Sequence, residues 1–141
     1  MAYYNKIGLL VLNRNRTKFL VCEPGITYGD KSVTQYLMPG GKFEEETEVE
    51  TLVAEIKEEL GCGVELRSLL FIGRYIDVAA SPGRDVLIQL YSGKLIGKPI
   101  ASTEIGALHW IGASDVDNPK VSQIIRNKII PDLIKKRILK G

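Results

Sequence analysis

Acidic side chains crowd one short stretch of this 141-residue chain. Residues 44–59 contain eight of its seventeen Asp and Glu residues, and Lys57 is the only base among them. At an effective dielectric constant of about 20, two carboxylates about 5 Å apart repel each other by on the order of 3 kcal/mol. A bound divalent cation relieves that repulsion, and hard Mg²⁺ and Mn²⁺ prefer carboxylate oxygens. The stretch therefore predicts a site for Mg²⁺ or Mn²⁺.

A helix is predicted to carry these carboxylates. Apolar residues recur at spacings of three and four along residues 49–60, which is typical of one buried helix face. They are Val49, Leu52, Val53, Ile56 and Leu60. Glu55, Glu58 and Glu59 fall together on the opposite side. Like charges one turn apart cost an exposed helix roughly 0.2 to 0.5 kcal/mol, so this arrangement favours a metal site; the alternative is a solvated surface that only increases solubility.

The turn Pro39-Gly40-Gly41 lies directly before the acidic stretch. Glycine lets the backbone approach a ligand closely and exposes its amides and carbonyls to that ligand. A glycine turn followed by carboxylates therefore suits a metal-bound phosphate. Gly61, at the other end of the predicted helix, is expected to act as the C-terminal cap.

The spacing of these residues resembles a known family signature. Gly40, five residues, Glu46, seven residues and then residues 54–62 are similar to the Nudix box, G-x5-E-x7-R-E-U-x-E-E-x-G-U, where U is apolar. Ala54 stands where the family has arginine, and the run between Gly-Gly-Lys and Glu-Thr is one residue short. The family's arginine orients the box carboxylates through charge-assisted hydrogen bonds, which a methyl group cannot make. Lys42 or Lys57 is a candidate substitute without the planar fork, so this departure predicts reduced turnover.

The resemblance implies a set of site residues. The metal ligands are expected to be Glu55, Glu58, Glu59 and the carbonyl of Gly40. Glu55 is also expected to be catalytic, and a further carboxylate, Glu46 or Glu104, would accept the proton of the attacking water. Glu104 qualifies because it lies in the loop before His109-Trp110, where several members of the family carry an additional carboxylate.

Phosphate-binding residues are expected near the same site. The candidates are Gly41, Lys42, Arg74 and Arg84; ordinary surface exposure is the alternative for the two arginines. Tyr28, Tyr36 and Tyr75 are possible stacking partners for a base, with packing as the alternative for each. His109 is expected to be structural.

The order of the remaining segments completes the predicted fold. We expect a β-hairpin from residues 4–13 and 18–22, a loop over 23–35 and a short strand over 36–38. Longer strands are expected over 64–77 and 85–95 around a turn at Ser81-Pro82-Gly83, with a last strand over 108–111. A helix over 120–139 should end or kink at Pro131. The fold class is α+β, a Nudix-type α/β/α sandwich with a central mixed β-sheet, in a single domain over residues 1–141.

Charge and composition indicate which kinds of ligand and partner the protein binds. The formal net charge is +2, yet the chain outside residues 44–59 holds eighteen bases against nine acids, which suits an anionic substrate. The basic segment 120–140 is interpreted as helix packing and solvation, so nucleic acid is an unlikely partner. Cys22 and Cys62 lack the spacing of a zinc site and are expected to be buried thiols. No secretion signal or membrane span is evident, which predicts a cytoplasmic protein. It is expected to be a monomer or homodimer.

The function implied by the resemblance is metal-dependent hydrolysis of a pyrophosphate bond in a nucleoside diphosphate-linked substrate. The short chain lacks side motifs of other subgroups and is most similar to the MutT-like branch, whose expected reaction converts a (deoxy)nucleoside triphosphate into a nucleoside monophosphate and pyrophosphate. Two alternatives remain open. The first alternative is a hydrolase of nucleotide sugars, dinucleotide polyphosphates or RNA 5′ ends. The second is a non-catalytic nucleotide-binding sensor.

Overall fold

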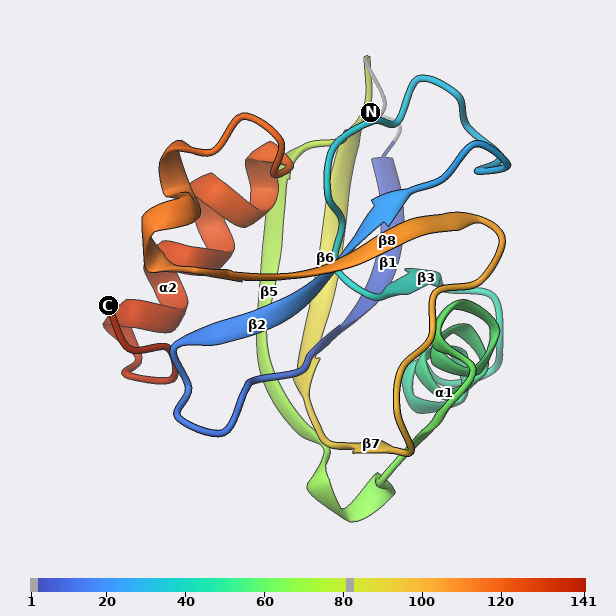
Figure 1. The fold of residues 1–141 in the computed structure, drawn as a ribbon, viewed down its shortest axis with the longest axis horizontal. Helices are drawn as coiled ribbons and strands as arrows, with labels where there is room; N and C mark the ends of the chain where they lie inside the picture. The colour runs from blue at the N-terminus through green and yellow to red at the C-terminus, as the bar shows by residue number, and fades with distance from the viewer. Residues whose placement is uncertain (1–2, 81–82) are drawn as a thin grey trace.

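The chain folds into three layers (Figure 1). The computed structural model describes residues 3–80 and 83–141. One helix covers one side of the β-sheets and a second helix covers the other, so the predicted α+β sandwich with a mixed sheet is confirmed. Ser81 and Pro82, which belong to the predicted turn, lie outside the described residues.

The central sheet has four strands in the order β3-β1-β6-β5. They are β1 (Tyr3–Leu10), β3 (Gly40–Lys42), β5 (Leu70–Val78) and β6 (Asp85–Ser92). β1 and β6 run parallel, whereas β3 and β5 pair antiparallel with their neighbours. The sheet is therefore mixed, and β1 lies inside it, between β6 and the glycine-containing strand β3.

The first two strands do not form the predicted hairpin ladder. β2 (Lys18–Pro24) pairs antiparallel with β8 (Ile105–Gly112) in a separate two-stranded sheet. The local hairpin survives only at its turn, where Leu12 bridges to Phe19. Leu9 and Leu10 are both fully buried, so β1 packs on both faces and its partners are chosen by tertiary packing instead of by the turn.

Three other strand predictions need correction. Residues 36–38 form isolated bridges and no strand. The run 64–77 divides into β4 (Gly63–Val64), a 3₁₀ turn at Leu66–Ser68 and β5. The turn forms because both the amide and the hydroxyl of Ser68 donate to the carbonyl of Glu65, which competes with an extended backbone. β6 ends at Ser92, and β7 (Leu95–Ile96) pairs with β4.

Helix α1 (Glu48–Leu60) is the predicted acidic helix. It begins at Thr47, whose Oγ1 accepts the Glu50 N–H at 3.1 Å, and it ends at Gly61 in the left-handed region at φ 65°, as expected of the C-terminal cap. Leu52, Ile56 and Leu60 are fully buried. Val49, predicted to join them, is 37% exposed, and Thr51 is buried in its place. The reason is that Thr51 Oγ1 accepts the N–H of Glu45, which closes the loop over the helix start.

The C-terminal helix runs through Pro131 without ending there. A π-helical segment, Ile125–Ile129, leads into α2 (Ile130–Lys135). The Ile130 N–H donates to the Ile125 carbonyl five residues back, and this wider turn accommodates a proline that cannot donate. The helix is therefore shorter than the predicted 120–139, but its apolar face packs as expected.

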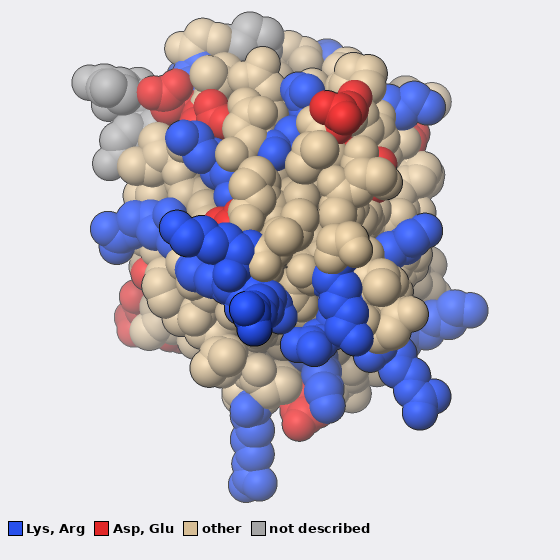
Figure 2. Space-filling view, turned by 90° about the vertical axis from the view of Figure 1, so that its left-hand side faces the viewer, with Lys and Arg blue, Asp and Glu red and all other residues tan. Residues whose placement is uncertain are grey.

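Two buried clusters flank the sheets. α2 and the π-helical segment contribute Ile125, Ile129 and Leu133 to one of them. α1 packs its apolar face into the other, which also contains Cys22 and Cys62 as buried free thiols, as predicted. Lysine and arginine side chains gather on the face that carries α2 (Figure 2). In the part of the chain that the structure describes, no helix is long and apolar enough to cross a membrane.

Candidate active site

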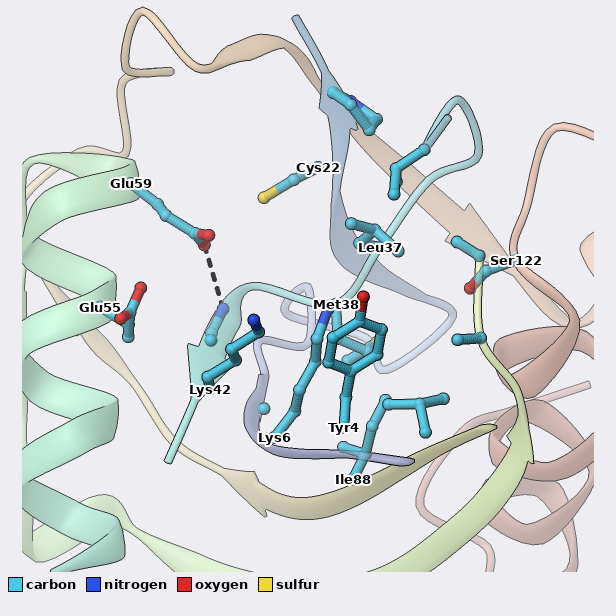
Figure 3. Close-up of a pocket in the computed structure, with 18 of the residues that line it drawn as sticks. Tyr4, Lys6, Cys22, Leu37, Met38, Lys42, Glu55, Glu59, Ile88 and Ser122 are labelled. Atoms are coloured by element: carbon cyan, nitrogen blue, oxygen red, sulfur yellow. Dashed lines mark hydrogen bonds between the residues drawn. The ribbon is translucent and has the colours of Figure 1, made fainter. Parts of the chain in front are cut away.

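A cavity of about 560 Å³ opens between α1, β1, β3 and the loop before β8 (Figure 3). One end is acidic and is lined by Glu44, Glu55, Glu59 and Glu104. The opposite end is mostly apolar and includes Leu37, Met38, Ile88 and Ile124. Lys6, Lys42 and Tyr4 line the region between them. A cavity of this size and mixed chemistry suits a charged ligand that also has an apolar part.

Gly40 and Gly41, predicted to form a turn, are instead the first two residues of strand β3, and the helix beside them shapes this segment. The Gly40 N–H donates to Glu59 Oε1 at 3.0 Å. Gly40 has φ 138°, and a side chain there would collide with the carbonyl oxygen of Ile7. A side chain at Gly41 would overlap the carboxylate of Glu55. Glycine is therefore required at position 40, where the contact is with backbone, whereas a side chain at position 41 would displace the Glu55 carboxylate. The two glycines bring β3 directly against the carboxylates of α1.

Glu55 and Glu59 are both difficult to ionise. Burial, followed by the charges of Glu58, Glu44 and Glu104, raises the pKa of Glu55 to about 7 from a usual 4.5. Burial raises the pKa of Glu59 to about 8, against the opposing effect of the Gly40 N–H. Perturbed carboxyl groups that meet in a cavity are typical of functional sites.

The donor set fits a hard divalent cation. The pKa values of these two half-buried carboxyl groups are raised by burial and by neighbouring carboxylates, so ionising them costs free energy. A bound cation offsets that cost of ionisation. Across residues 3–80 and 83–141, no three His, Cys, Asp or Glu side chains are already gathered as a ligand cluster. Glu58 is exposed and does not line the cavity, although its charge acts on Glu55. Glu55 and Glu59 are thus the pair best placed to hold Mg²⁺ or Mn²⁺.

The two candidates for the proton acceptor lie in different places. Glu104 lines the cavity because its loop is tied to α1 and to β2: the Ser102 N–H donates to the Glu59 carbonyl at 3.0 Å, and the Gly25 N–H donates to the Glu104 carbonyl at 2.7 Å. Glu46 is exposed and outside the cavity lining. Of Glu104 and Glu46, only Glu104 therefore faces the ligand space. Ala54 is exposed as well.

The predicted phosphate-binding residues also divide by position. Gly41 and Lys42 line the cavity. Arg84 is not part of the cavity lining. Its guanidinium lies 5.0 Å from the ring centroid of Tyr4, and Tyr4 does line the cavity. Arg74 lies outside the lining and its Nε donates to Gln89 Oε1 at 3.3 Å.

The aromatic candidates and His109 have mostly structural surroundings. His109 Nε2 lies 2.8 Å from Glu23 Oε1, and its ring stacks on Tyr36 at a centroid distance of 4.4 Å. Tyr75 is buried and donates to Asp132. Tyr28 lines the cavity, where burial and then the charge of Glu59 raise its pKa to about 12.

Sequence reasoning missed several residues that line the cavity. Tyr4 and Lys6 share one face of β1, a period-two signal that was present in the sequence but did not reveal which face meets the site. Ser122 carried no signal. Its hydroxyl is the one buried side-chain polar atom without a hydrogen-bond partner in the described part of the chain. Such an orphan in a cavity wall calls for a ligand.

Comparison with known proteins agrees with the geometry. The sequence model of the NUDIX domain matches residues 3–133. The chain therefore belongs to the NUDIX family, which supports its being a hydrolase of pyrophosphate bonds. The comparison with curated proteins gave no match.

Solved structures show the same fold at low sequence identity. The MutT protein from Methanosarcina mazei Go1 is 15% identical with a TM-score of 0.73, covering 96% of each chain. The E. coli ORF135 protein is 16% identical with a TM-score of 0.71, covering 97% of this chain and 92% of that one. A MutT NUDIX hydrolase from Burkholderia pseudomallei is 20% identical with a TM-score of 0.66, over 87% of this chain and 92% of the other.

Proposed function

We propose that this protein is a Mg²⁺-dependent pyrophosphohydrolase that converts (deoxy)nucleoside triphosphates into nucleoside monophosphates and pyrophosphate. The observation that carries the proposal is the pair Glu55 and Glu59, whose pKa values are raised where α1 meets the glycine-containing strand β3 in the wall of a ligand-sized cavity. We further propose that the protein acts in the cytoplasm, where free nucleoside triphosphates are abundant. We propose that it acts there as a monomer or homodimer.

The chain's residues have separate roles in this reaction. Glu55 and Glu59 would hold the cation, with the Gly40 carbonyl as a further ligand, whereas Glu58 lies outside the cavity lining and acts on Glu55 through its charge. When bound, Mg²⁺ neutralises phosphate charge and lowers the pKa of the attacking water. Glu104 accepts the proton of that water, because it lines the cavity on a loop that backbone hydrogen bonds tie to α1 and to the residue after β2.

The other residues position the substrate. Gly41 and Lys42 bind the phosphates beside the carboxylates. The nucleoside occupies the apolar end between Met38 and Ile88, where a base buries apolar area. The orphan hydroxyl of Ser122 hydrogen-bonds to the polar edge of the base. Burial of that hydroxyl is otherwise uncompensated.

A non-catalytic nucleotide sensor is the second candidate function. It is favoured by Ala54, because Glu46 forms no hydrogen bond or ion pair with any described residue and so lacks the partner that the family's arginine supplies. Such a module would bind nucleotides without releasing products.

The first test is turnover with Mg²⁺ on a panel of nucleoside triphosphates, nucleotide sugars, dinucleotide polyphosphates and triphosphorylated RNA, with products identified by mass spectrometry. Glu59→Gln is expected to lower kcat/KM by about 100-fold or more, the upper range for disturbed metal sites. It should keep the fold, because the amide oxygen still accepts the Gly40 N–H. Glu65→Gln, an exposed glutamate outside the cavity, is the matched control. Near-normal activity of Glu59→Gln would contradict the assignment, and binding without products would support the sensor.

A further inference from the structure

We propose that Lys6, Lys42 and Arg84 form a second phosphate site around the ring of Tyr4, for a phosphate group that lies outside the scissile pyrophosphate. This inference rests on the proposed function and narrows its substrate class. Substrates with three or more phosphates in a row would use the site. Nucleotide sugars, which have two, would not.

Three cations converge on one aromatic ring. Lys42 Nζ lies 4.8 Å from the Tyr4 centroid, Lys6 Nζ lies at 5.6 Å and the Arg84 guanidinium lies at 5.0 Å. Lys6 is directly opposite Lys42 in the antiparallel β1–β3 ladder, and Tyr4 is two residues before Lys6 on the same face of β1. Figure 3 shows the side chains of these three residues in the same part of the cavity.

This arrangement is unfavourable without an anion. Like charges directly opposite each other on neighbouring strands destabilise a sheet. The negative face of the Tyr4 ring compensates part of that repulsion. Neither Lys42 nor Arg84 has an ion pair with any carboxylate among the residues that the structure describes. The cluster therefore retains positive charge that a phosphate can neutralise through charge-assisted hydrogen bonds.

The simpler explanation is that these cations only balance the acidic end of the cavity. It accounts for Lys6, whose surroundings include the charges of Glu59 and Glu55. It does not account for Arg84, which comes from the turn before β6 and meets Tyr4 instead of a carboxylate. Since Lys6 and Lys42 line the same cavity as Glu55 and Glu59, a phosphate chain held at the metal can extend towards Tyr4.

Anion binding tests the cluster without requiring turnover. Isothermal titration of the metal-free protein with inorganic tripolyphosphate is compared for the wild type, Lys42→Gln, Arg84→Gln and Arg67→Gln. Arg67 is an exposed arginine outside the cavity and serves as the matched control. Loss of a hydrogen bond to a charged group is expected to raise the Kd roughly 10-fold or more for the first two variants. A wild-type protein that fails to bind, or equal affinity in all four proteins, would overturn the proposal.

Kinetics then separate this inference from the proposed function. Arg84→Gln should lower kcat/KM about 10-fold for a nucleoside triphosphate and leave an ADP-sugar unchanged. Tyr4→Phe keeps the ring and should behave as the wild type, whereas Tyr4→Leu should resemble Arg84→Gln. Equal losses on both substrates would overturn the second site while the hydrolase function stands. Tripolyphosphate binding without any hydrolysis would preserve the site and reject the proposed function.

Discussion

Two carboxylates carry the proposed chemistry at the scale of single residues. Glu55 and Glu59 sit one helical turn apart on α1, and β3 closes over them because Gly40 and Gly41 carry no side chain. Their mutual repulsion adds to the cost of burial, and both effects favour the protonated form. A carboxyl group that is protonated near neutral pH is a weak metal ligand, so metal binding and proton release are coupled here.

We predict that this coupling appears in thermal stability. Folded-state pKa values of about 7 for Glu55 and about 8 for Glu59 lie above the usual 4.5. The folded state therefore binds more protons than the unfolded state, and the metal-free Tm should fall as the pH rises from about 5 to about 8. Mg²⁺ should raise the Tm more at pH 8 than at pH 5. Differential scanning calorimetry with and without Mg²⁺ measures both slopes, and Glu59→Gln should flatten them; a metal-free Tm that rises with pH over this range would refute the prediction.

Ala54 is the residue whose replacement tests what limits the enzyme's rate. Replacing it with arginine restores the planar fork of the family signature beside the box carboxylates. We predict that Ala54→Arg raises kcat/KM by about tenfold, comparable to restored support of a metal ligand. Ala54→Lys supplies charge without the fork and should give a smaller gain. Steady-state kinetics on the best substrate decide this, and an unchanged rate in both variants would show that the chain compensates for the missing arginine.

At the scale of elements, the layers are joined by a few polar contacts. Tyr75 on β5 donates to Asp132 on α2 at 2.5 Å, and Lys136 lies 2.9 Å from the same oxygen. Tyr91 on β6 donates to Glu48 at the start of α1 at 2.6 Å. These bonds fix each helix against the sheet, while the apolar faces supply most of the contact area. The position of α1 relative to β3 depends on this framework.

The Tyr75–Asp132 bond gives a test at this scale. Tyr75→Phe removes a hydrogen bond to a charged group and should lower the free energy of unfolding by about 1.5 to 3 kcal/mol, with kcat unchanged. Burial acts to raise the pKa of Asp132, but the bonds from Tyr75 and Lys136 outweigh it and lower the pKa below its usual 3.8. The contribution of ionised Asp132 to the free energy of unfolding is therefore present above about pH 4. It is lost as the pH falls through the lower pKa that Asp132 has in the folded state. Urea unfolding of Tyr75→Phe, Asp132→Asn and the double variant should give a coupling energy that vanishes in strong acid.

At the scale of the whole molecule, charge is separated. Acidic residues are concentrated on α1 and its preceding loop, while the rest of the chain is basic and includes the exposed Lys128, Lys135 and Arg137. Lysine and arginine side chains gather on the face shown in Figure 2. Fields of this kind steer anionic ligands towards a protein. The net charge of +2 conceals this separation.

We predict that substrate capture depends on ionic strength. Between about 0.1 M and about 1 M salt the screening length shrinks from about 10 Å to about 3 Å, so kcat/KM for a nucleoside triphosphate should fall several-fold. The chemical step occurs inside the cavity, and kcat at saturating substrate and Mg²⁺ should change by less than about twofold. A salt titration of both parameters is the measurement. If kcat/KM were insensitive to salt, steering by the basic surface would be ruled out.

Local spacing and backbone freedom were enough to predict the acidic helix, its Gly61 cap and the α+β class. They did not predict that Gly40 and Gly41 lie in strand β3 and not in a turn. Tertiary structure decided the rest. β1 and β2 carry apolar residues on both faces, so only packing could assign them to different sheets. Glu104, Tyr4, Lys6 and Ser122 come from segments far apart in the chain and meet in one cavity only after β2, β8 and α1 are joined by backbone hydrogen bonds. Helical spacing places neighbours within one element, whereas contacts between elements depend on how the whole chain buries its apolar surface.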